Sequence, residues 1–373
     1  MQYLTGHISD SKKCHILYEA DNLKALLHLS QTGWNEKIDV VYIDPPYNTG
    51  FSQFRKYKDK FWDYYSRERH QKWLQFMRQR LQALLPLLHE KSVVFISIDD
   101  REMPYLNILL REFFGENNVE VMIWDKIPAG GTAGQGKMKR SKRFRVDHEY
   151  ILVAYRDKSK VKFNRPQVIV PVQKHYDNPD NDPRGPWISA ELCKSKAKSL
   201  PHGKNYYQII TPGGRKIERQ WHISKEEFDQ LDADNRIWWG NGKIIPRLKK
   251  FVHEPRPVVP SSIIKNISQT EGLKDLIALL PDASFDNPKP VRLIKYLLEM
   301  TVSGESVVLD FFAGTGTTGQ AVMELNLEKK LNLQCILISH NEKNVVNKLL
   351  IPRIKKFIEG QKKGKCCWQY YKV

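Results

Sequence analysis

The sequence predicts an α/β protein whose main sheet is assembled from both ends of the chain, with an irregular, β-rich insert between them. Three observations support this fold class. Short β-branched runs alternate with segments of helical periodicity near both ends. Between about 156 and 283 the alternation stops, because Pro, Gly, Asn, Asp and Trp become frequent. Each end has too few strands for a stable sheet of its own, so we expect both ends to share one sheet.

The composition indicates a folded protein with a polyanionic partner. The chain has 373 residues, of which 41% are hydrophobic and 11% aromatic, so it can bury a substantial core and is not a disordered protein. Its 60 Lys and Arg against 42 Asp and Glu give a formal net charge of +18. Such a charge favours association with a nucleic acid or an anionic membrane, and it says nothing about the fold.

The sequence favours nucleic acid over a membrane. The longest apolar stretch, around Ala83 to Leu88, is interrupted by Pro86 and is much shorter than the ~20 residues that span a bilayer. The start, MQYLTGHISD, lacks the basic and apolar segments of a signal peptide. The five cysteines show no metal-binding or disulfide spacing, so we expect no metal site, no disulfide and a reducing, cytoplasmic location.

The N-terminal part alternates strands and helices. Its first strand, 39–43, is the run DVVYI, which ends before Pro45 and Pro46. Helical spacing of apolar residues and a closing Gly115 indicate the helices. The elements after strand 39–43 are helix 67–89, strand 92–98, helix 100–114 and strands 119–124 and 149–155. Segment 126–146 holds seven Lys or Arg residues, four Gly and no acid, which predicts a basic loop.

The alternation returns near the C-terminus. Helix 291–301 precedes strand 306–309, and the Gly-rich segment DFFAGTGTTG (310–319) leads into a helix that extends to Leu327. The last expected elements are strand 333–339 and helix 344–359. A Gly-rich loop between a strand and a helix is typical of nucleotide-type cofactor sites.

A first candidate site is Asp44-Pro45-Pro46-Tyr47, directly after strand 39–43. Ligands of open α/β sheets bind at the carboxyl ends of strands. The Asp44 carboxylate and a proline carbonyl only accept hydrogen bonds, and the prolines hold the backbone rigid. Tyr47 offers a flat face for stacking. These groups suit a planar amino group such as adenine N6, although Asp-Pro is also common in plain strand-end turns.

A second candidate site extends from Asp310 to Thr318. It is neither a GxGxxG motif nor a P-loop. Gly314 and Gly316 allow a tight turn and close approach of a ligand. Thr317 and Thr318 begin a helix, and the N-terminus of a helix favours an anionic group such as a phosphate or a carboxylate.

The two motifs together resemble the amino-methylating DNA methyltransferases, which use S-adenosylmethionine and carry a DPPY and an FxGxG motif. DPPY (44–47) precedes FAGTG (312–316), which is the circularly permuted order of the β class. The chain resembles in particular the adenine-N6 modification (Mod) subunits of type III-like restriction-modification systems. Further shared segments are YIDPPYNTG (42–50), YKDKFW (57–62), WLQFMRQRL (73–81), FISIDDRE (95–102), HEYILVAY (148–155), DNDPRGPW (180–187), FDNPKP (285–290) and PRIKKFI (352–358).

This resemblance implies a domain organisation and a reaction. Residues 1–155, with DPPY and the basic loop, and residues 285–373, with FAGTG and a basic tail, would form one Rossmann-like methyltransferase sheet. The insert at 156–284 would be the target recognition domain. The family reaction moves a methyl group from S-adenosylmethionine directly to N6 of an adenine that is flipped out of double-stranded DNA.

The resemblance also assigns catalytic roles. Asp44 and the Pro45 carbonyl would accept hydrogen bonds from the adenine amino group, while Pro46 would hold the backbone. Tyr47 would stack on the flipped base. Catalysis would then depend on positioning and electrostatics.

Cofactor and DNA roles follow in the same way. Asp310 would bind the methionine ammonium group, Lys289 the carboxylate and Glu342 the ribose hydroxyls, although Lys289 and Glu342 could also serve only the ends of helices. The cofactor loop would comprise Phe312, Gly314, Gly316, Thr317 and Thr318. The cations assigned to the DNA backbone are Lys137, Lys139, Arg140, Lys142, Arg143 and Arg145.

Several alternatives stay open at this level. The amine could be cytosine N4, the substrate could be RNA, or the chain could be a DNA-binding subunit without activity. An Asp at the first DPPY position favours adenine, the permuted order with a large insert favours DNA, and two intact motifs favour an enzyme. Homodimerisation and a restriction or specificity subunit are further partner hypotheses. Mod subunits are usually longer than this chain, so a stand-alone or differently partnered enzyme is also expected.

The basic loop generates a first prediction. Replacing its cations at 137–145 with Gln should weaken DNA binding and flatten its salt dependence, because each phosphate contact contributes about 0.9 to the slope of log K against log salt. Fluorescence anisotropy of a labelled duplex between low and moderate salt measures this slope. A slope equal to that of the unmodified protein would show that the loop does not contact phosphates.

Overall fold

The computed structural model describes residues 2–3, 14–49, 68–127, 144, 146–165, 167–169, 176–361 and 366–372. The chain divides into two compact units. Unit 1 comprises residues 1–165 and 260–373, and unit 2 comprises residues 166–259. Unit 2 is therefore shorter at both ends than the insert expected from the sequence, 156–284.

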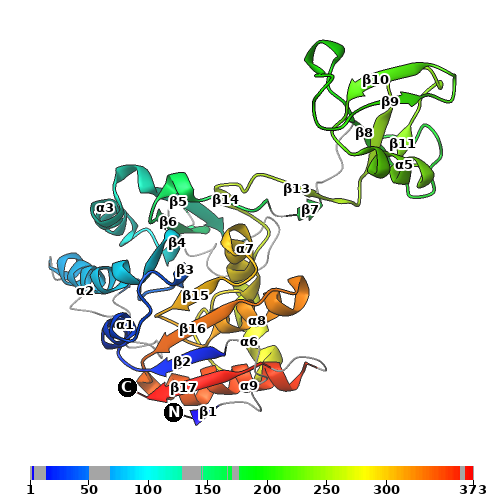
Figure 1. The fold of residues 1–373 in the computed structure, drawn as a ribbon. Helices are drawn as coiled ribbons and strands as arrows, with labels where there is room; N and C mark the ends of the chain where they lie inside the picture. The colour runs from blue at the N-terminus through cyan, green and yellow to red at the C-terminus, as the bar shows by residue number, and fades with distance from the viewer. Residues whose placement is uncertain are drawn as a thin grey trace. The chain divides into compact units, whose positions relative to one another are not determined.

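Unit 1 is built on one large sheet (Figure 1). Among the described residues this sheet has ten strands in the order β1-β17-β2-β16-β15-β3-β4-β6-β5-β14. In chain order the strands are β1 (Gln2–Tyr3), β2 (His15–Glu19), β3 (Ile38–Ile43), β4 (Leu88–Ile98), β5 (Val119–Asp125), β6 (His148–Tyr155), β14 (Ile263–Ile264), β15 (Val307–Asp310), β16 (Gln334–Ser339) and β17 (Trp368–Lys372).

The two ends of the chain meet in the middle of this sheet. Strand β15, from the C-terminal part, pairs in parallel with β3, from the N-terminal part, and Val308 lies opposite Val40. The neighbouring pairs from β17 to β4 are also parallel, whereas β6 is antiparallel to both β4 and β5. The predicted α/β sheet shared by both ends is thus confirmed.

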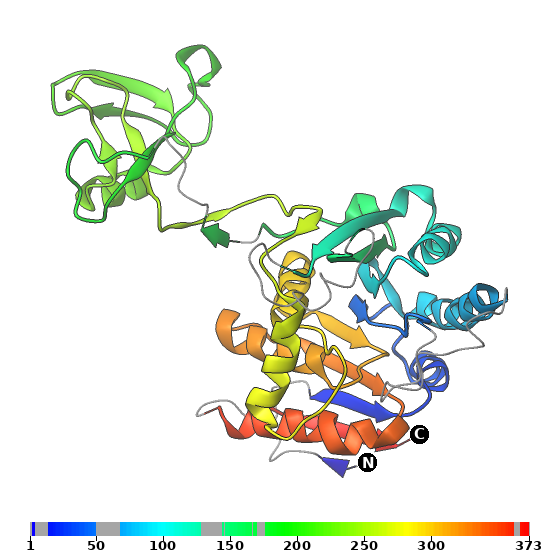
Figure 2. The ribbon, with the colours of Figure 1, turned by 180° about the vertical axis from the view of Figure 1, so that it is seen from behind.

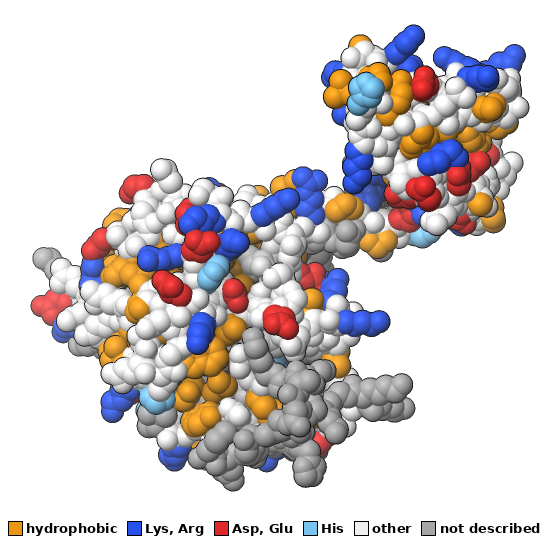
Figure 3. All heavy atoms as spheres, viewed as in Figure 1, with side chains coloured by type: hydrophobic (Ala, Val, Ile, Leu, Met, Phe, Trp, Pro, Cys, Tyr) orange, Lys and Arg blue, Asp and Glu red, His pale blue; other side chains and the backbone are white. Residues whose placement is uncertain are grey.

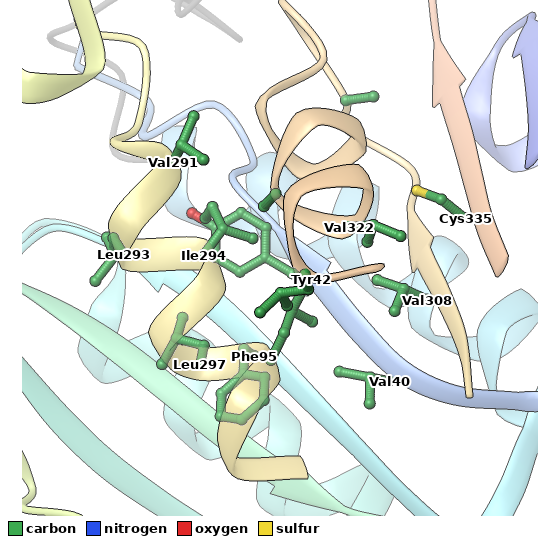
Figure 4. Close-up of a cluster of buried hydrophobic side chains, with 14 of the residues drawn as sticks. Val40, Tyr42, Phe95, Val291, Leu293, Ile294, Leu297, Val308, Val322 and Cys335 are labelled. Atoms are coloured by element: carbon green, nitrogen blue, oxygen red, sulfur yellow. The ribbon is translucent and has the colours of Figure 1, made fainter. Parts of the chain in front are cut away.

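Helices cover both faces of the sheet (Figures 1 and 2). They are α1 (Asn22–Gln31), α2 (Arg69–Leu84) and α3 (Met103–Phe114) on one face, and α6 (Gln269–Leu279), α7 (Val291–Thr301), α8 (Thr317–Lys329) and α9 (Ile351–Glu359) on the other. Strand β3 shows the resulting alternation: Val40 and Tyr42 pack with the second group of helices, and Val41 and Ile43 with the first. Figure 4 shows the core around Tyr42.

One expected helix is shorter in the structure. The sequence predicts a helix over 67–89, but α2 ends at Leu84, a 3₁₀ turn follows at Leu85–Leu87, and β4 starts at Leu88. Pro86 explains the early end, because proline lacks the N–H that would continue the helix. The predicted stop of the next helix at Gly115 is confirmed, with Gly115 at φ 91°.

Strand β17, which lies between β1 and β2 in the sheet, corrects the prediction for the cysteines. The sequence suggests no disulfide, yet Cys14 and Cys367 are joined by one, with 4.7 Å between their Cα atoms. Each cysteine directly precedes one strand of the parallel pair β2–β17. Because the two cysteines are 353 residues apart and neither strand was expected, sequence spacing could not reveal the pairing.

In the part of unit 2 that the structure describes, small antiparallel sheets are joined by one α-helix. The pairings are β10 with β9, β12 with both β11 and β8, and β13 with β7. Its elements are β7 (Gln167–Ile169), β8 (Trp187–Glu191), β9 (Tyr206–Ile210), β10 (Lys216–Gln220), α5 (Lys225–Ala233), β11 (Ile237–Trp238), β12 (Arg247–Phe251) and β13 (Pro255–Pro257). Its charge is uneven: Figure 3 shows Asp and Glu side chains gathered on the lower part of this unit and Lys and Arg along its upper edge.

A buried lysine connects the segment DNDPRGPW to the sheet of β12. Lys249, 1% exposed, forms ion pairs with Asp180 and Asp182. Asp182 also accepts hydrogen bonds from the Arg184 guanidinium, which lowers the pKa of Asp182 well below its usual range. Asp180 accepts a hydrogen bond from the Trp187 indole. This segment therefore organises the interior of unit 2.

We expect Lys249→Met to destabilise unit 2 by roughly 3–5 kcal/mol, because it leaves buried Asp182 and partly buried Asp180 without their ammonium partner. Hydrogen exchange of the whole chain, followed by mass spectrometry over residues 176–259, measures the effect. Exposed Lys225, which pairs with Asp229, gives the matched control Lys225→Met, with a cost below about 1 kcal/mol. Equal exchange in the two variants would contradict the structural role of Lys249.

Candidate active site

Both sequence motifs lie at the carboxyl ends of adjacent parallel strands. Asp44 follows β3, and Asp310 is the last residue of β15. From β15 the chain passes through α8 to β16 on one side, whereas from β3 it passes through α2 to β4 on the other. The β3–β15 pair is therefore a topological switch point, where ligands of open α/β sheets bind.

The loop after β15 is shaped by glycine and by hydrogen bonds. Gly314 and Gly316 have φ values of 50° and 82°, which side chains with a Cβ rarely adopt. A Cβ on Gly316 would also lie 3.1 Å from the Leu350 side chain. The Asp310 carboxylate accepts hydrogen bonds from the Phe312 N–H (2.9 Å) and the Thr318 hydroxyl (2.6 Å). These contacts fix the loop at the start of α8.

The buried Arg353 of α9 forms hydrogen bonds with side chains of the same loop. Its guanidinium donates to the hydroxyls of Thr315 (3.0 Å) and Thr317 (2.9 Å) and to Gln320 Oε1 (2.8 Å). Burial lowers the pKa of Arg353 to about 10, which still leaves it charged at neutral pH. Sequence reasoning noted the segment PRIKKFI but gave Arg353 no role, because only the fold brings α9 to the loop.

A cavity of about 170 Å³ opens between the two motifs. DPPY, the Gly-rich loop and the segment before α7 all contribute to its lining. The lining residues are Tyr42, Asp44, Pro45, Pro46, Tyr47, Phe285, Asp286, Asn287, Pro288, Lys289, Asp310, Phe312, Ala313, Gly314, Thr315, Thr317 and Thr318. The structure thus brings together the predicted catalytic residues and most of the predicted cofactor residues.

The DPPY segment is held in place by neighbouring side chains. The Pro46 carbonyl accepts a hydrogen bond from the Trp73 indole (2.7 Å). The Tyr47 hydroxyl donates to Glu149 Oε2 (3.1 Å). Burial and the nearby Asp44 carboxylate raise the pKa of Tyr47 well above its usual value, so its phenol stays protonated.

The Lys289 side chain contacts two of the predicted catalytic residues. Its ammonium contacts Asp44 Oδ1 (2.9 Å), Asp44 Oδ2 (3.0 Å), the Tyr47 hydroxyl (2.8 Å) and Glu149 Oε2 (3.3 Å). Burial raises the pKa of Asp44, and the Lys289 ammonium opposes this shift. The expected contact of Lys289 with a cofactor carboxylate stays a prediction.

A second group beside DPPY was missed by the sequence analysis. Asn48 has φ 54° and donates to buried Glu102 (2.7 Å), which also contacts His70 Nδ1 (2.8 Å). Glu102 belongs to FISIDDRE and Glu149 to HEYILVAY, so both stood in segments that carried the resemblance. The hydrogen-bond partners of Glu102 and Glu149 lie on other elements, so only the folded arrangement of β4, β6 and α2 around DPPY identifies them.

Glu342 lies apart from the first cavity. It lines a second cavity of about 660 Å³, formed by residues 279–285 and by side chains after β16. Phe285 lines both cavities, so the two are neighbours. The role of Glu342 in binding the ribose stays a prediction. The residue itself lies beside the neighbouring cavity and not in the one that the Gly-rich loop lines.

The predicted DNA-binding loop is not described by the structure. The predicted DNA contacts Lys137, Lys139, Arg140, Lys142, Arg143 and Arg145 lie outside the described residues. Among the residues that the structure describes, no helix has the length and hydropathy needed to cross a membrane.

The sheet and its switch-point cavity define a Rossmann-like α/β protein with a candidate ligand site. The chain belongs to the DNA methylase family, which matches residues 38–347. It is 34% identical over 355 residues to the type III restriction-modification enzyme StyLTI Mod subunit of Salmonella typhimurium (strain LT2), covering 86% of this chain and 52% of that protein.

Two further relatives match a similar share of this chain at lower identity. The EcoP15I Mod subunit of Escherichia coli is 26% identical over 390 residues, which cover 88% of this chain and 58% of that protein. The type II methyltransferase M.KpnI of Klebsiella pneumoniae is 27% identical over 367 residues, which cover 87% of this chain and 80% of that protein. The matched region therefore spans little more than half the length of the two Mod subunits.

Because Asp310 is buried, we expect it to make the free energy of unfolding depend on pH. Burial raises the pKa of Asp310 from 3.8 to about 7, against hydrogen bonds from Thr318 and Phe312 that lower it. Between about pH 4 and pH 7 the folded state therefore binds more protons at this residue than the unfolded state, and its stability falls as pH rises.

We expect Asp310→Asn to remove this part of the pH dependence. Urea unfolding at several pH values between 4 and 7.5 measures the free energy of unfolding, and the slope against pH is the readout. The slope of the wild type should be more negative than that of Asp310→Asn. Equal slopes would mean that Asp310 is ionised in the folded protein throughout this range.

Proposed function

We propose that this chain transfers a methyl group from S-adenosylmethionine to N6 of adenine in double-stranded DNA. The observation that carries this proposal is the single cavity lined by both DPPY and the Gly-rich loop. One motif offers acceptors and a ring face for a planar amine, and the other offers a cofactor loop. The relatives named as restriction-modification Mod subunits support the assignment.

The residues around the cavity fit this cofactor. The Asp310 carboxylate is 3% exposed, and its two hydrogen bonds come from uncharged donors, Phe312 N–H and the Thr318 hydroxyl. A buried carboxylate of this kind is stabilised by a cation, and the ammonium group of the methionine part provides one. Phe285 and Glu342 in the adjoining cavity would hold the adenosine part.

The chain's own residues would then act on the base. When bound, S-adenosylmethionine supplies a methyl group on a positively charged sulfur. The Asp44 oxygens would accept hydrogen bonds from the amino group, which increases electron density on N6. Tyr47 would stack on the flipped ring, and Trp73 would hold the Pro46 carbonyl and so the backbone between Asp44 and Tyr47. These residues would contribute to catalysis by positioning the base and by electrostatic complementarity to the transition state.

We further propose that this activity belongs to a restriction-modification system in the cytoplasm, where the cell's DNA is the substrate. The cytoplasmic location rests on the substrate alone, because a disulfide such as Cys14–Cys367 is uncommon in a reducing compartment. The homodimer and the restriction or specificity subunit stay predictions. Co-purification of the tagged chain from its native cells would test both partners.

Nucleoside analysis tests the reaction itself. DNA from cells with and without this chain is digested to nucleosides, and mass spectrometry distinguishes N6-methyladenine from N4-methylcytosine. We expect N6-methyladenine only in cells that carry the chain, and sequencing of the modified positions gives the recognition sequence. N4-methylcytosine would contradict the adenine assignment, and no new methylated nucleoside would contradict the activity.

The catalytic residues give a further prediction. Asp44→Ala and Tyr47→Ala should each reduce methyl transfer by roughly 100-fold or more, because each removes a group that contacts the base in the transition state. Binding of S-adenosylhomocysteine, measured by calorimetry, should change little in the Tyr47 variant. Full activity of Asp44→Ala would rule out the proposed role of the carboxylate.

A further inference from the structure

Lys289 contacts the same groups that the target base would contact in the proposed reaction. Its ammonium lies within 3.0 Å of both Asp44 oxygens and 4.8 Å from the centre of the Tyr47 ring. The first are the acceptors proposed for the adenine amino group, and the second is the stacking platform. Lys289 and an adenine would therefore compete for both features, so the ammonium has to withdraw when the base enters.

Withdrawal of a buried ammonium is costly unless another anion receives it. Lys289 is 8% exposed, and an unpaired charge at such a position is strongly unfavourable. Glu149 offers the second anion, because its Oε2 already lies 3.3 Å from the Lys289 ammonium. Only a short displacement separates the position on Asp44 from one on Glu149.

Glu149 is suited to hold a cation permanently. It is 6% exposed, and its Oε1 forms an ion pair with Lys126 (3.0 Å). Burial would raise the pKa of Glu149, but the ammonium groups of Lys289 and Lys126 outweigh this and keep the carboxylate ionised. Glu149 is absent from the described cavity lining, which contains Asp44, Tyr47 and Lys289. The base therefore does not need Glu149, and Glu149 can keep the lysine.

We propose that Glu149 is a positioning residue that takes over the Lys289 ammonium when Asp44 turns to the target base. This inference rests on the proposed function of the same site. Without the Glu149 charge, Lys289 would remain on Asp44, and the site would lose its ability to recognise the 6-amino group. The loss would depend on Lys289, because Glu149 acts through it.

The test compares duplexes that carry adenine or purine at the target position. Purine lacks the 6-amino group, so the ratio of the two dissociation constants reports amino-group recognition in the absence of catalysis. Fluorescence anisotropy with S-adenosylhomocysteine present measures the ratio for the wild type, Glu149→Gln, Glu149→Asp, and Glu149→Gln combined with Lys289→Met. The recognition sequence comes from the methylation analysis above.

We expect Glu149→Gln to shift the ratio toward purine by about tenfold. The shift should be largely reversed both in Glu149→Asp, which restores the charge, and in the double variant, which removes the lysine. A control is Glu120→Gln, whose carboxylate contacts a tyrosine, Tyr155, and a lysine, Lys158, whereas that of Glu149 contacts a tyrosine and two lysines. Its ratio should equal that of the wild type.

Two results would overturn the inference. An unchanged ratio in Glu149→Gln would show that Lys289 leaves Asp44 without help. A shift that persists in the double variant would mean that Glu149 acts on the fold or on Tyr47 and not through Lys289. In both cases a wild type that methylates DNA leaves the proposed function intact. A wild type that transfers no methyl group removes both proposals.

Discussion

The parallel pairing of β3 with β15 is the constraint on which the rest of the structure depends. The Val307 N–H donates to Asp39 across 268 residues of chain, and Val308 and Leu309 continue the register beside Val40 and Val41. This register places the ends of both strands side by side, so Asp44 and Asp310 line one cavity. A shift of one residue would reverse the faces of all side chains in a strand and separate the site from its core.

Burial of charge around this pairing explains much of the site's chemistry. Asp310, Glu149 and Lys289 are each less than 9% exposed, and they differ in how they are compensated. Asp310 has neutral donors, and burial raises its pKa to about 7. Glu149 has two ammonium groups, and Lys289 bridges two carboxylates. Under the proposed function, Asp310, which has no charged partner, would face the cationic cofactor group, and Lys289 would lie where the neutral base enters.

The sequence predicted those parts of the fold that local patterns determine. The strand DVVYI, the Gly-rich turn and the stop at Gly115 each follow from residue type and spacing, and the structure confirms them. Strands β2 and β17 were missed, because their partners are distant in sequence and β17 lies in a segment that composition marked as a basic tail. For the same reason Glu149, Glu102 and Arg353 had no assigned roles. Their partners lie on other elements, and no local pattern identifies such contacts.

The shared segments of the sequence therefore serve different physical purposes. DPPY and FAGTG line the cavity, whereas DNDPRGPW supplies the Asp180, Asp182 and Trp187 contacts inside unit 2. In HEYILVAY, Ile151 and Val153 pack in the core, and Glu149 accepts a hydrogen bond from the Tyr47 hydroxyl. A segment that carries a family resemblance is thus weak evidence of a catalytic role by itself. The role proposed for Glu149 rests on its burial and on its contact with the lysine that covers Asp44, and not on the resemblance of the segment.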